Sequence, residues 1–191
     1  MESDSKENLE KARKLFERGR YEEVFPMYHA LAEAGSVEAQ LLIGWMYYTG
    51  HGVKEDIDQA FQWYHKAADS KSAAGQYFLG TIHRAKKDYQ QALQCFEESA
   101  AQDYVPAFYQ LGQAYEYGEG VNVQRTKSLE YYQVAAIKGH LMARRVIALM
   151  TIKGEFGLKR IPLGLLEFVR VLITGFQVSW SSPYDDRLRW E

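Results

Sequence analysis

The sequence predicts an all-α fold, a right-handed α-solenoid of about five stacked helical hairpins. Three observations predict it: short amphipathic segments with helical spacing, glycine-rich turns between them, and recurrence of the pattern along the chain. The 191 residues include only 4 prolines, in agreement with helical runs. Because one hairpin cannot bury its apolar face alone, the copies are expected to stack into a single domain, residues 1–191.

The clearest copy spans residues 39–68, with two amphipathic segments joined by a turn. Gly50 and Gly52 flank His51, which favours a helix end followed by a tight turn. Asp56 is expected to cap the second helix. The apolar or small residues at helical spacing are Ala39, Leu42, Ile43, Met46 and Tyr47, then Ile57, Ala60, Phe61, Tyr64, Ala67 and Ala68. They predict two helices, each with one buried face.

A second full copy spans residues 107–136, and a shorter copy lies between the two. Gly44 and Gly80 are 36 positions apart, whereas Gly80 and Gly112 are 32 apart. The spacing of the second helices shows that the four missing residues belong to the turn of the short copy. Stacked hairpins tolerate a deletion in such a turn.

A first hairpin and a degenerate last hairpin complete the expected array. The predicted repeats are residues 7–35, 37–70, 73–104, 105–139 and 141–175, followed by a tail over 176–191. In the last repeat a second helix is expected over residues 163–174, where only Glu167 and Arg170 interrupt an apolar run. The stretch of residues 161–178 is too short and too charged to predict a transmembrane helix.

The repeated residues resemble a known family. The pattern A-x-x-x-[IL]-G-x-x-Y-x-x-G-x-G-V, followed by A-x-x-[WY]-Y-x-x-A-A, is similar to the Sel-one-like repeat, a branch of the tetratricopeptide superfamily. The short copy is closer to an ordinary tetratricopeptide repeat. Departures are Gln124 in place of Asp, Ser128 in place of Ala, and His83 in place of Tyr. The resemblance implies a scaffold or regulator in multi-protein assemblies, often bacterial ones.

Composition argues against several function classes. The formal net charge of −2 gives no electrostatic basis for binding nucleic acid or an anionic membrane. The single cysteine, Cys95, stands at the position of Trp63 and Tyr131, so we interpret it as a packing residue and not as a nucleophile. One cysteine and a charged start without an apolar segment favour a reducing compartment, and we expect a cytoplasmic protein.

No pattern in the sequence predicts catalysis, a cofactor or a metal site. His29 and His65 share a repeat position that elsewhere holds Glu97 and Gln133, which predicts solvated surface. The glycine-rich turns follow helices and so lack the strand-loop-helix context of a phosphate site. We therefore expect a protein that is not an enzyme.

The resemblance implies a partner-binding groove lined by the first helix of each hairpin. The implied residues are Leu41, Trp45 and Tyr48 in the first full copy, Tyr77, Thr81 and Arg84 in the short copy, Tyr109, Gln113, Glu116 and Tyr117 in the next, and Arg145 in the last. Tyrosine and tryptophan are frequent in binding hot spots. The alternative is that several of the rings pack between adjacent helices and that Arg145 lies on a solvated face.

Two functions remain open at this stage. The first is an adaptor that holds a protein or peptide segment in the groove without performing chemistry. The second assigns the function to the apolar last helix and the tail, as a homodimer face or a contact with a membrane surface.

Overall fold

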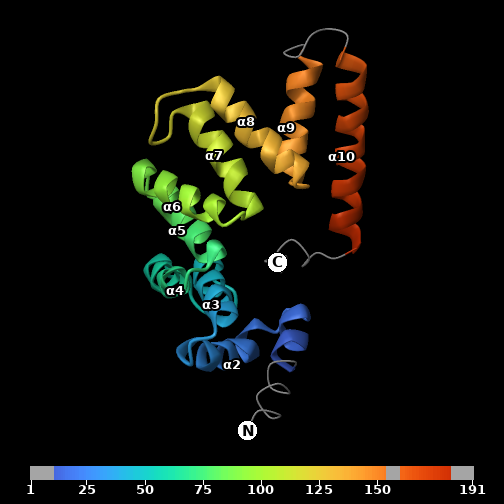
Figure 1. The fold of residues 1–191 in the computed structure, drawn as a ribbon. Helices are drawn as coiled ribbons and strands as arrows, with labels where there is room; N and C mark the ends of the chain where they lie inside the picture. Colours follow the sequence, from blue (N-terminus) through green and yellow to red (C-terminus); the bar gives the residue numbers. More distant parts are fainter. Residues whose placement is uncertain (1–10, 154–159, 182–191) are drawn as a thin grey trace. The chain divides into compact units, whose positions relative to one another are not determined.

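The protein is all-helical throughout the part that its computed structural model describes, residues 11–153 and 160–181, with side chains described as far as residue 174. This confirms the predicted all-α fold. The chain divides into two compact units, Met1–Lys86 and Lys87–Glu191. The first unit contains helical residues 11–17 and the helices α2 (Tyr21–Glu33), α3 (Val37–Thr49), α4 (Ile57–Asp69) and α5 (Ala73–Ala85) (Figure 1).

The second unit contains the remaining helices. They are α6 (Tyr89–Ala101), α7 (Val105–Tyr117), α8 (Arg125–Ile137), α9 (Leu141–Ile152) and α10 (Ile161–Ser181) (Figure 1). Within each unit, successive helices pack against one another: α2 on α3, α3 on α4 and α4 on α5, then α6 on α7, α7 on α8, α8 on α9 and α9 on α10. This order of packing is that of a helical repeat.

Each full hairpin is closed by a tyrosine of its second helix, which lies on a glycine of its first helix. Tyr64 of α4 and Tyr132 of α8 are both 1% exposed. A Cβ atom added to Gly44 would lie 2.6 Å from the ring of Tyr64, and one added to Gly112 would lie 2.6 Å from the ring of Tyr132. The glycine and the tyrosine of the repeat are therefore one packing unit.

The turns follow the sequence prediction. Gly50 ends α3 in the left-handed conformation, with φ 73°, and the Asp56 side chain caps α4 by accepting from the backbone N–H groups of Asp58 and Gln59 at 3.0 and 2.9 Å. Residues 50–56 connect α3 to α4, residues 118–124 connect α7 to α8, and residues 86–88 connect α5 to α6. The deletion predicted for the short copy is thus confirmed and lies in its turn.

Replacing Gln124 with aspartate should stabilise the protein by about 1 kcal/mol. Gln124 has the extended backbone of an N-cap residue, φ −136° and ψ 91°, close to Asp56, but its side chain makes no capping hydrogen bond. The shorter carboxylate can reach the free N–H groups of α8 and also favours the positive end of the helix dipole. Urea denaturation followed by circular dichroism measures the gain. Equal stabilities of Gln124→Asp and Gln124→Ala would contradict this explanation.

Helix α10 differs from the expected last helix. It continues to Ser181, whereas the last predicted repeat ends at residue 175. Residues 175–181 contain no proline, and the first one after them is Pro183, so the sequence allows the longer helix. None of the described helices is both long enough and apolar enough to cross a membrane.

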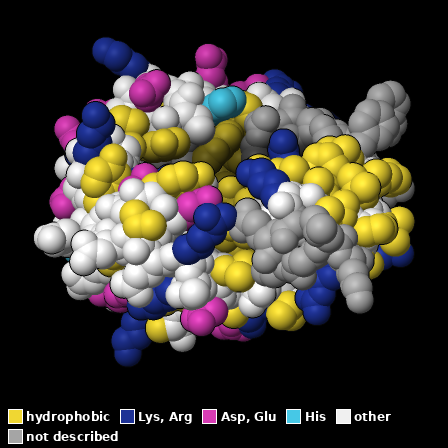
Figure 2. Space-filling view, turned by 90° about the horizontal axis from the view of Figure 1, so that it is seen from above, with side chains coloured by type: hydrophobic (Ala, Val, Ile, Leu, Met, Phe, Trp, Pro, Cys, Tyr) yellow, Lys and Arg dark blue, Asp and Glu magenta, His cyan; other side chains and the backbone are white. Residues whose placement is uncertain are grey.

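One face of α10 carries exposed apolar side chains. They are Leu163, Leu165, Leu166, Val169, Leu172 and Ile173, each between 49% and 58% exposed. Gly164 and Val171 lie on the opposite, buried side, where α10 packs on α9. Figure 2 shows hydrophobic side chains gathered at the right of the view, the side on which α10 lies in Figure 1. We call the six exposed residues the α10 face.

Candidate functional site

In the first unit, Trp45 of α3 is held in a cluster of aromatic rings. Its ring centroid lies 5.5 Å from Phe16 and 5.7 Å from Tyr21, both edge-on. The ring also stacks on His51 at 4.9 Å, with 26° between the planes. Trp45 is half-buried, so its exposed part has a fixed orientation.

The other implied residues of the first unit differ in exposure. Leu41 is buried, while Tyr48, one turn from Trp45 on α3, is 39% exposed. On α5, Tyr77, Thr81 and Arg84 are half-buried. The Tyr77 ring lies edge-on to Phe78 at 5.2 Å, and the Thr81 hydroxyl donates to the Phe78 carbonyl at 2.7 Å.

In the second unit, Tyr109 of α7 stacks on His140, the residue that caps α9. The ring centroids are 4.7 Å apart and the planes are inclined by 22°. Burial lowers the pKa of His140, so its imidazole is neutral near pH 7, and Nδ1 accepts from the Ala143 N–H at 3.3 Å. The Gln113 amide donates to the Tyr109 hydroxyl at 3.3 Å. Tyr109 and Gln113 are thus brought together.

Glu116 is also fixed, because its Oε2 accepts from the buried Tyr132 hydroxyl at 2.6 Å. Burial, and next this hydrogen bond, raise the pKa of Tyr132, so the phenol stays protonated. Tyr117 follows at the end of α7 and is 63% exposed. Arg145 of α9 is exposed.

The aromatic members of the eleven implied residues therefore fall into two kinds. Most of the aromatic ones, such as Trp45 and Tyr109, are half-buried and packed on neighbouring rings. Tyr48 and Tyr117 expose a large share of their surface. Each unit thus presents one exposed tyrosine on a first helix that also holds a fixed, half-buried ring.

The histidines of the shared repeat position differ from each other. His65 is exposed, as expected, and lies 3.0 Å from a carboxylate oxygen of Asp69. His29 is half-buried, with its ring 5.3 Å from Trp63, so the expected solvated surface is not found there. Within the described residues, no three His, Cys, Asp or Glu side chains lie close enough together to hold a metal ion.

Cys95 should react slowly with iodoacetamide near neutral pH. Burial, and next the carboxylate of Glu98, raise the pKa of this half-buried thiol to about 11. Since the thiolate is the reactive species, the alkylation rate should rise about tenfold per pH unit between pH 8 and 10. Mass spectrometry of quenched samples gives the rate, with the urea-unfolded protein as the fast control. A plateau below pH 9 would contradict the assigned pKa.

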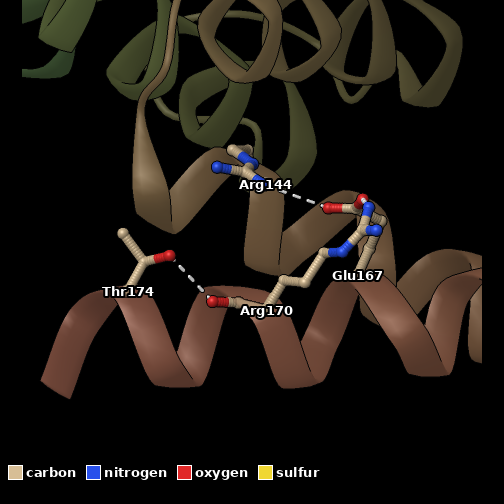
Figure 3. A network of polar contacts seen from close by, with 4 residues as sticks. All are labelled: Arg144, Glu167, Arg170 and Thr174. Carbon is tan, nitrogen blue, oxygen red and sulfur yellow. Dashed lines mark hydrogen bonds and ion pairs between the residues drawn. The ribbon is translucent and has the colours of Figure 1, made fainter. Parts of the chain in front are cut away.

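A polar network and a pocket in the last hairpin were not predicted. Arg144 of α9 donates to Glu167 of α10 at 3.0 Å, and Arg170 donates to the other Glu167 oxygen at 2.8 Å (Figure 3). Hydrogen bonds from Arg144 and Arg170 lower the pKa of Glu167, so the carboxylate stays charged at neutral pH. The pocket beside the network is lined from α8, α9 and α10. The repeat spacing could have indicated the pocket, because it aligns Glu167 with Trp63 and so places a carboxylate at the position of a large ring.

The repeats identify the family. A model of the Sel1 repeat matches residues 3–20, 37–72, 73–104 and 106–140, which together make up more than half of the chain. The chain belongs to the Sel1 repeat family. The resemblance found in the sequence is thereby confirmed, and three of the matched ranges agree closely with predicted repeats.

Relatives of this Sel1 repeat chain are longer proteins. An uncharacterized protein of Neisseria meningitidis serogroup B is 30% identical over 129 residues, which are 66% of this chain and 27% of that protein. The chain spans about a quarter of the length of the curated relatives that it matches.

Two crystal structures show the same fold. A Sel1 repeat protein from Oxalobacter formigenes has a TM-score of 0.76 and 27% identity, covering 87% of this chain and 69% of that one. A protective antigen of uropathogenic Escherichia coli with an SLR fold has a TM-score of 0.70 and 24% identity, covering 91% of this chain and 41% of that one. At the latter identity the similarity concerns the fold alone.

Proposed function

We propose that this chain is a non-enzymatic interaction module that binds a segment of a partner protein along the first helices of its repeats. The observation that carries the proposal is the exposure of Tyr48 and Tyr117, 39% and 63%, on helices that also hold fixed aromatic rings. Membership of the Sel1 repeat family supports it, since such proteins mostly serve as scaffolds.

The arrangement suits peptide binding for a physical reason. An exposed tyrosine brings a large contact area, few torsions and one polar group, so little conformational entropy is lost on binding. The rings of Trp45 and Tyr109 are already held by their stacked neighbours, His51 and His140, and each offers a rigid surface on the same first helix as an exposed tyrosine. Arg84, Glu116 and Arg145 would add polar contacts that select among segments.

A pull-down from the native host tests the proposal. The double variant Tyr48→Ala/Tyr117→Ala should lose the partners that the wild type retains. Circular dichroism of the variant checks that it stays folded, since Tyr48 is only 39% exposed. Gln62→Ala/Glu130→Ala is the matched control, since both residues are exposed on second helices. If the two double variants recovered every partner equally, the first helices would not be the binding surface.

A second candidate function rests on the α10 face. We propose that it pairs with the α10 face of a second copy of the chain. Its residues recur at the three-to-four-residue spacing of a helix–helix seam, as in Leu165, Val169 and Leu172. The neighbouring Glu167 and Arg170 pair with each other within α10 at 2.8 Å.

Light scattering after size-exclusion chromatography decides on this second candidate. The wild type should have the mass of a dimer, and Val169→Glu/Leu172→Glu that of a monomer, because both substitutions place charges in the seam. Thr174→Glu on the polar side of α10 is the control and should remain dimeric. A monomeric wild type would exclude the pairing.

A further inference from the structure

A pocket of about 380 Å³ opens between α8, α9 and α10 of the second unit. This volume lies in the range of about 300–1,000 Å³ that is typical of small-ligand sites. The apolar part of its lining consists of Ala136 and Ile137 from α8, Ile147 and Ala148 from α9, and Leu163 and Gly164 from α10. The pocket therefore favours an apolar group.

The repeat pattern explains why space is left at this point. Three repeat steps before Glu167 stands Trp63 of α4, whose ring is 4% exposed and lies 5.3 Å from His29 of the preceding second helix. The counterpart of His29 on α8 is Gln133, and Gln133 and Glu167 both line the pocket. The last hairpin thus lacks the aromatic ring that fills this place in the first full repeat.

The charged residues around the pocket are unbalanced. Arg144, Arg160 and Glu167 line it, and Glu167 is shared between Arg144 and Arg170 (Figure 3). Among the described residues of the lining, two guanidinium groups thus stand against one carboxylate, which also pairs with Arg170 outside the lining. An additional negative charge at the pocket would be stabilised by this excess of positive charge.

We propose that this pocket binds an aromatic ring with an adjoining carboxylate, the ring in the place that Trp63 takes in the first full repeat and the carboxylate against Arg160. The pocket is lined from α8, α9 and α10 and does not include Tyr48 or Tyr117. The pocket proposal and the proposed binding of a partner segment at these tyrosines can therefore fail independently of each other. Such a group can come from a partner protein, or from Trp190 and Glu191 of the chain itself, which lie outside the described residues.

The chain is long enough for Trp190 to reach the pocket. The nine residues from Ser181 to Trp190 can span up to about 30 Å when extended. Along α10, Ser181 is about 27 Å from Leu163. The experiment therefore includes a variant that separates the two sources.

Titration of the full-length chain with indole-3-propionate, followed by NMR, tests the proposal. Arg160→Gln should weaken binding at least about tenfold, because a charge-assisted hydrogen bond is lost. The neutral indole-3-propionamide should bind the wild type more weakly by a similar factor. Arg125→Gln, at an exposed arginine of α8 outside the pocket, is the control and should bind as the wild type does. Glu167→Trp places a ring in the pocket and should abolish binding.

The variant Trp190→Ala identifies the source. Binding about tenfold or more tighter than in the wild type, or binding found in this variant alone, would support the pocket with the chain's own Trp190 as its occupant. Equal affinities in Trp190→Ala and the wild type would support a partner protein as the source. Equal weakening by Arg160→Gln and Arg125→Gln, or no binding to either the wild type or Trp190→Ala, would overturn the proposal.

Discussion

Replacing Gly120 with alanine is expected to lower the free energy of unfolding by about 2–5 kcal/mol. Gly120 has φ +77°, a conformation that costs an L-residue about 1–2 kcal/mol. A Cβ atom there would also lie 2.8 Å from the carbonyl carbon of Tyr89 and closer still to its oxygen. These atoms belong to the backbone at the start of α6 and cannot rotate away, so an overpacking cost of about 1–3 kcal/mol is added.

The variant Gly139→Ala separates the conformational cost of a positive φ from the overpacking cost. Gly139 also has a positive φ, +95°, but a Cβ atom there would meet nothing within 4 Å. This control should therefore show only the conformational cost, about 1–2 kcal/mol. Urea denaturation followed by circular dichroism measures both variants. Equal losses in Gly120→Ala and Gly139→Ala would mean that the close contact with α6 contributes nothing.

Replacing Tyr132 with alanine should cost about 3–5 kcal/mol, as expected for truncating a large buried aromatic side chain. The ring is 1% exposed and lies on Gly112, and its hydroxyl donates to Glu116 at 2.6 Å. Tyr132→Phe keeps the ring and loses only the hydrogen bond, so it should cost about 0.5–1.5 kcal/mol. Thermal and urea denaturation of the full-length chain give both values.

The pairing of Gly112 with Tyr132 predicts a change of sign. In the wild type, Gly112→Ala should destabilise, because its Cβ atom would lie 2.6 Å from the Tyr132 ring. In the Tyr132→Ala background the same substitution should stabilise by up to about 1 kcal/mol, since alanine is the better helix former and the clash is gone. Equal effects of Gly112→Ala in both backgrounds would show that the two residues do not act as one packing unit.

The sequence predicted those parts of the fold that depend on local chemistry. Asp56 was recognised as a cap because a short carboxylate before an apolar segment can accept from free N–H groups. The short turn was located correctly from the repeat spacing, such as the 32 positions between Gly80 and Gly112, because this spacing can be counted on both helices of a hairpin. The first-helix residues followed from the family pattern, and their role in binding stays a prediction.

Other features depend on contacts between distant residues, which spacing alone does not give. Trp45 was expected in a groove, and its half-burial arises from Phe16 and Tyr21, which come from an earlier hairpin. The ion pair of Arg144 and Glu167 joins residues 23 positions apart on two helices. The pocket beside it is lined by Glu167, a carboxylate at the repeat position where the first full repeat has Trp63.

The role of the first helices is tested most directly by site-specific photo-crosslinking in the native host. A benzophenone amino acid is placed at Tyr48 or Tyr117 on first helices, or at the exposed Gln62 or Glu130 on second helices. We predict that positions 48 and 117 crosslink to a protein partner and that positions 62 and 130 do not. Adducts at 62 and 130 with none at 48 and 117 would contradict the proposed binding surface.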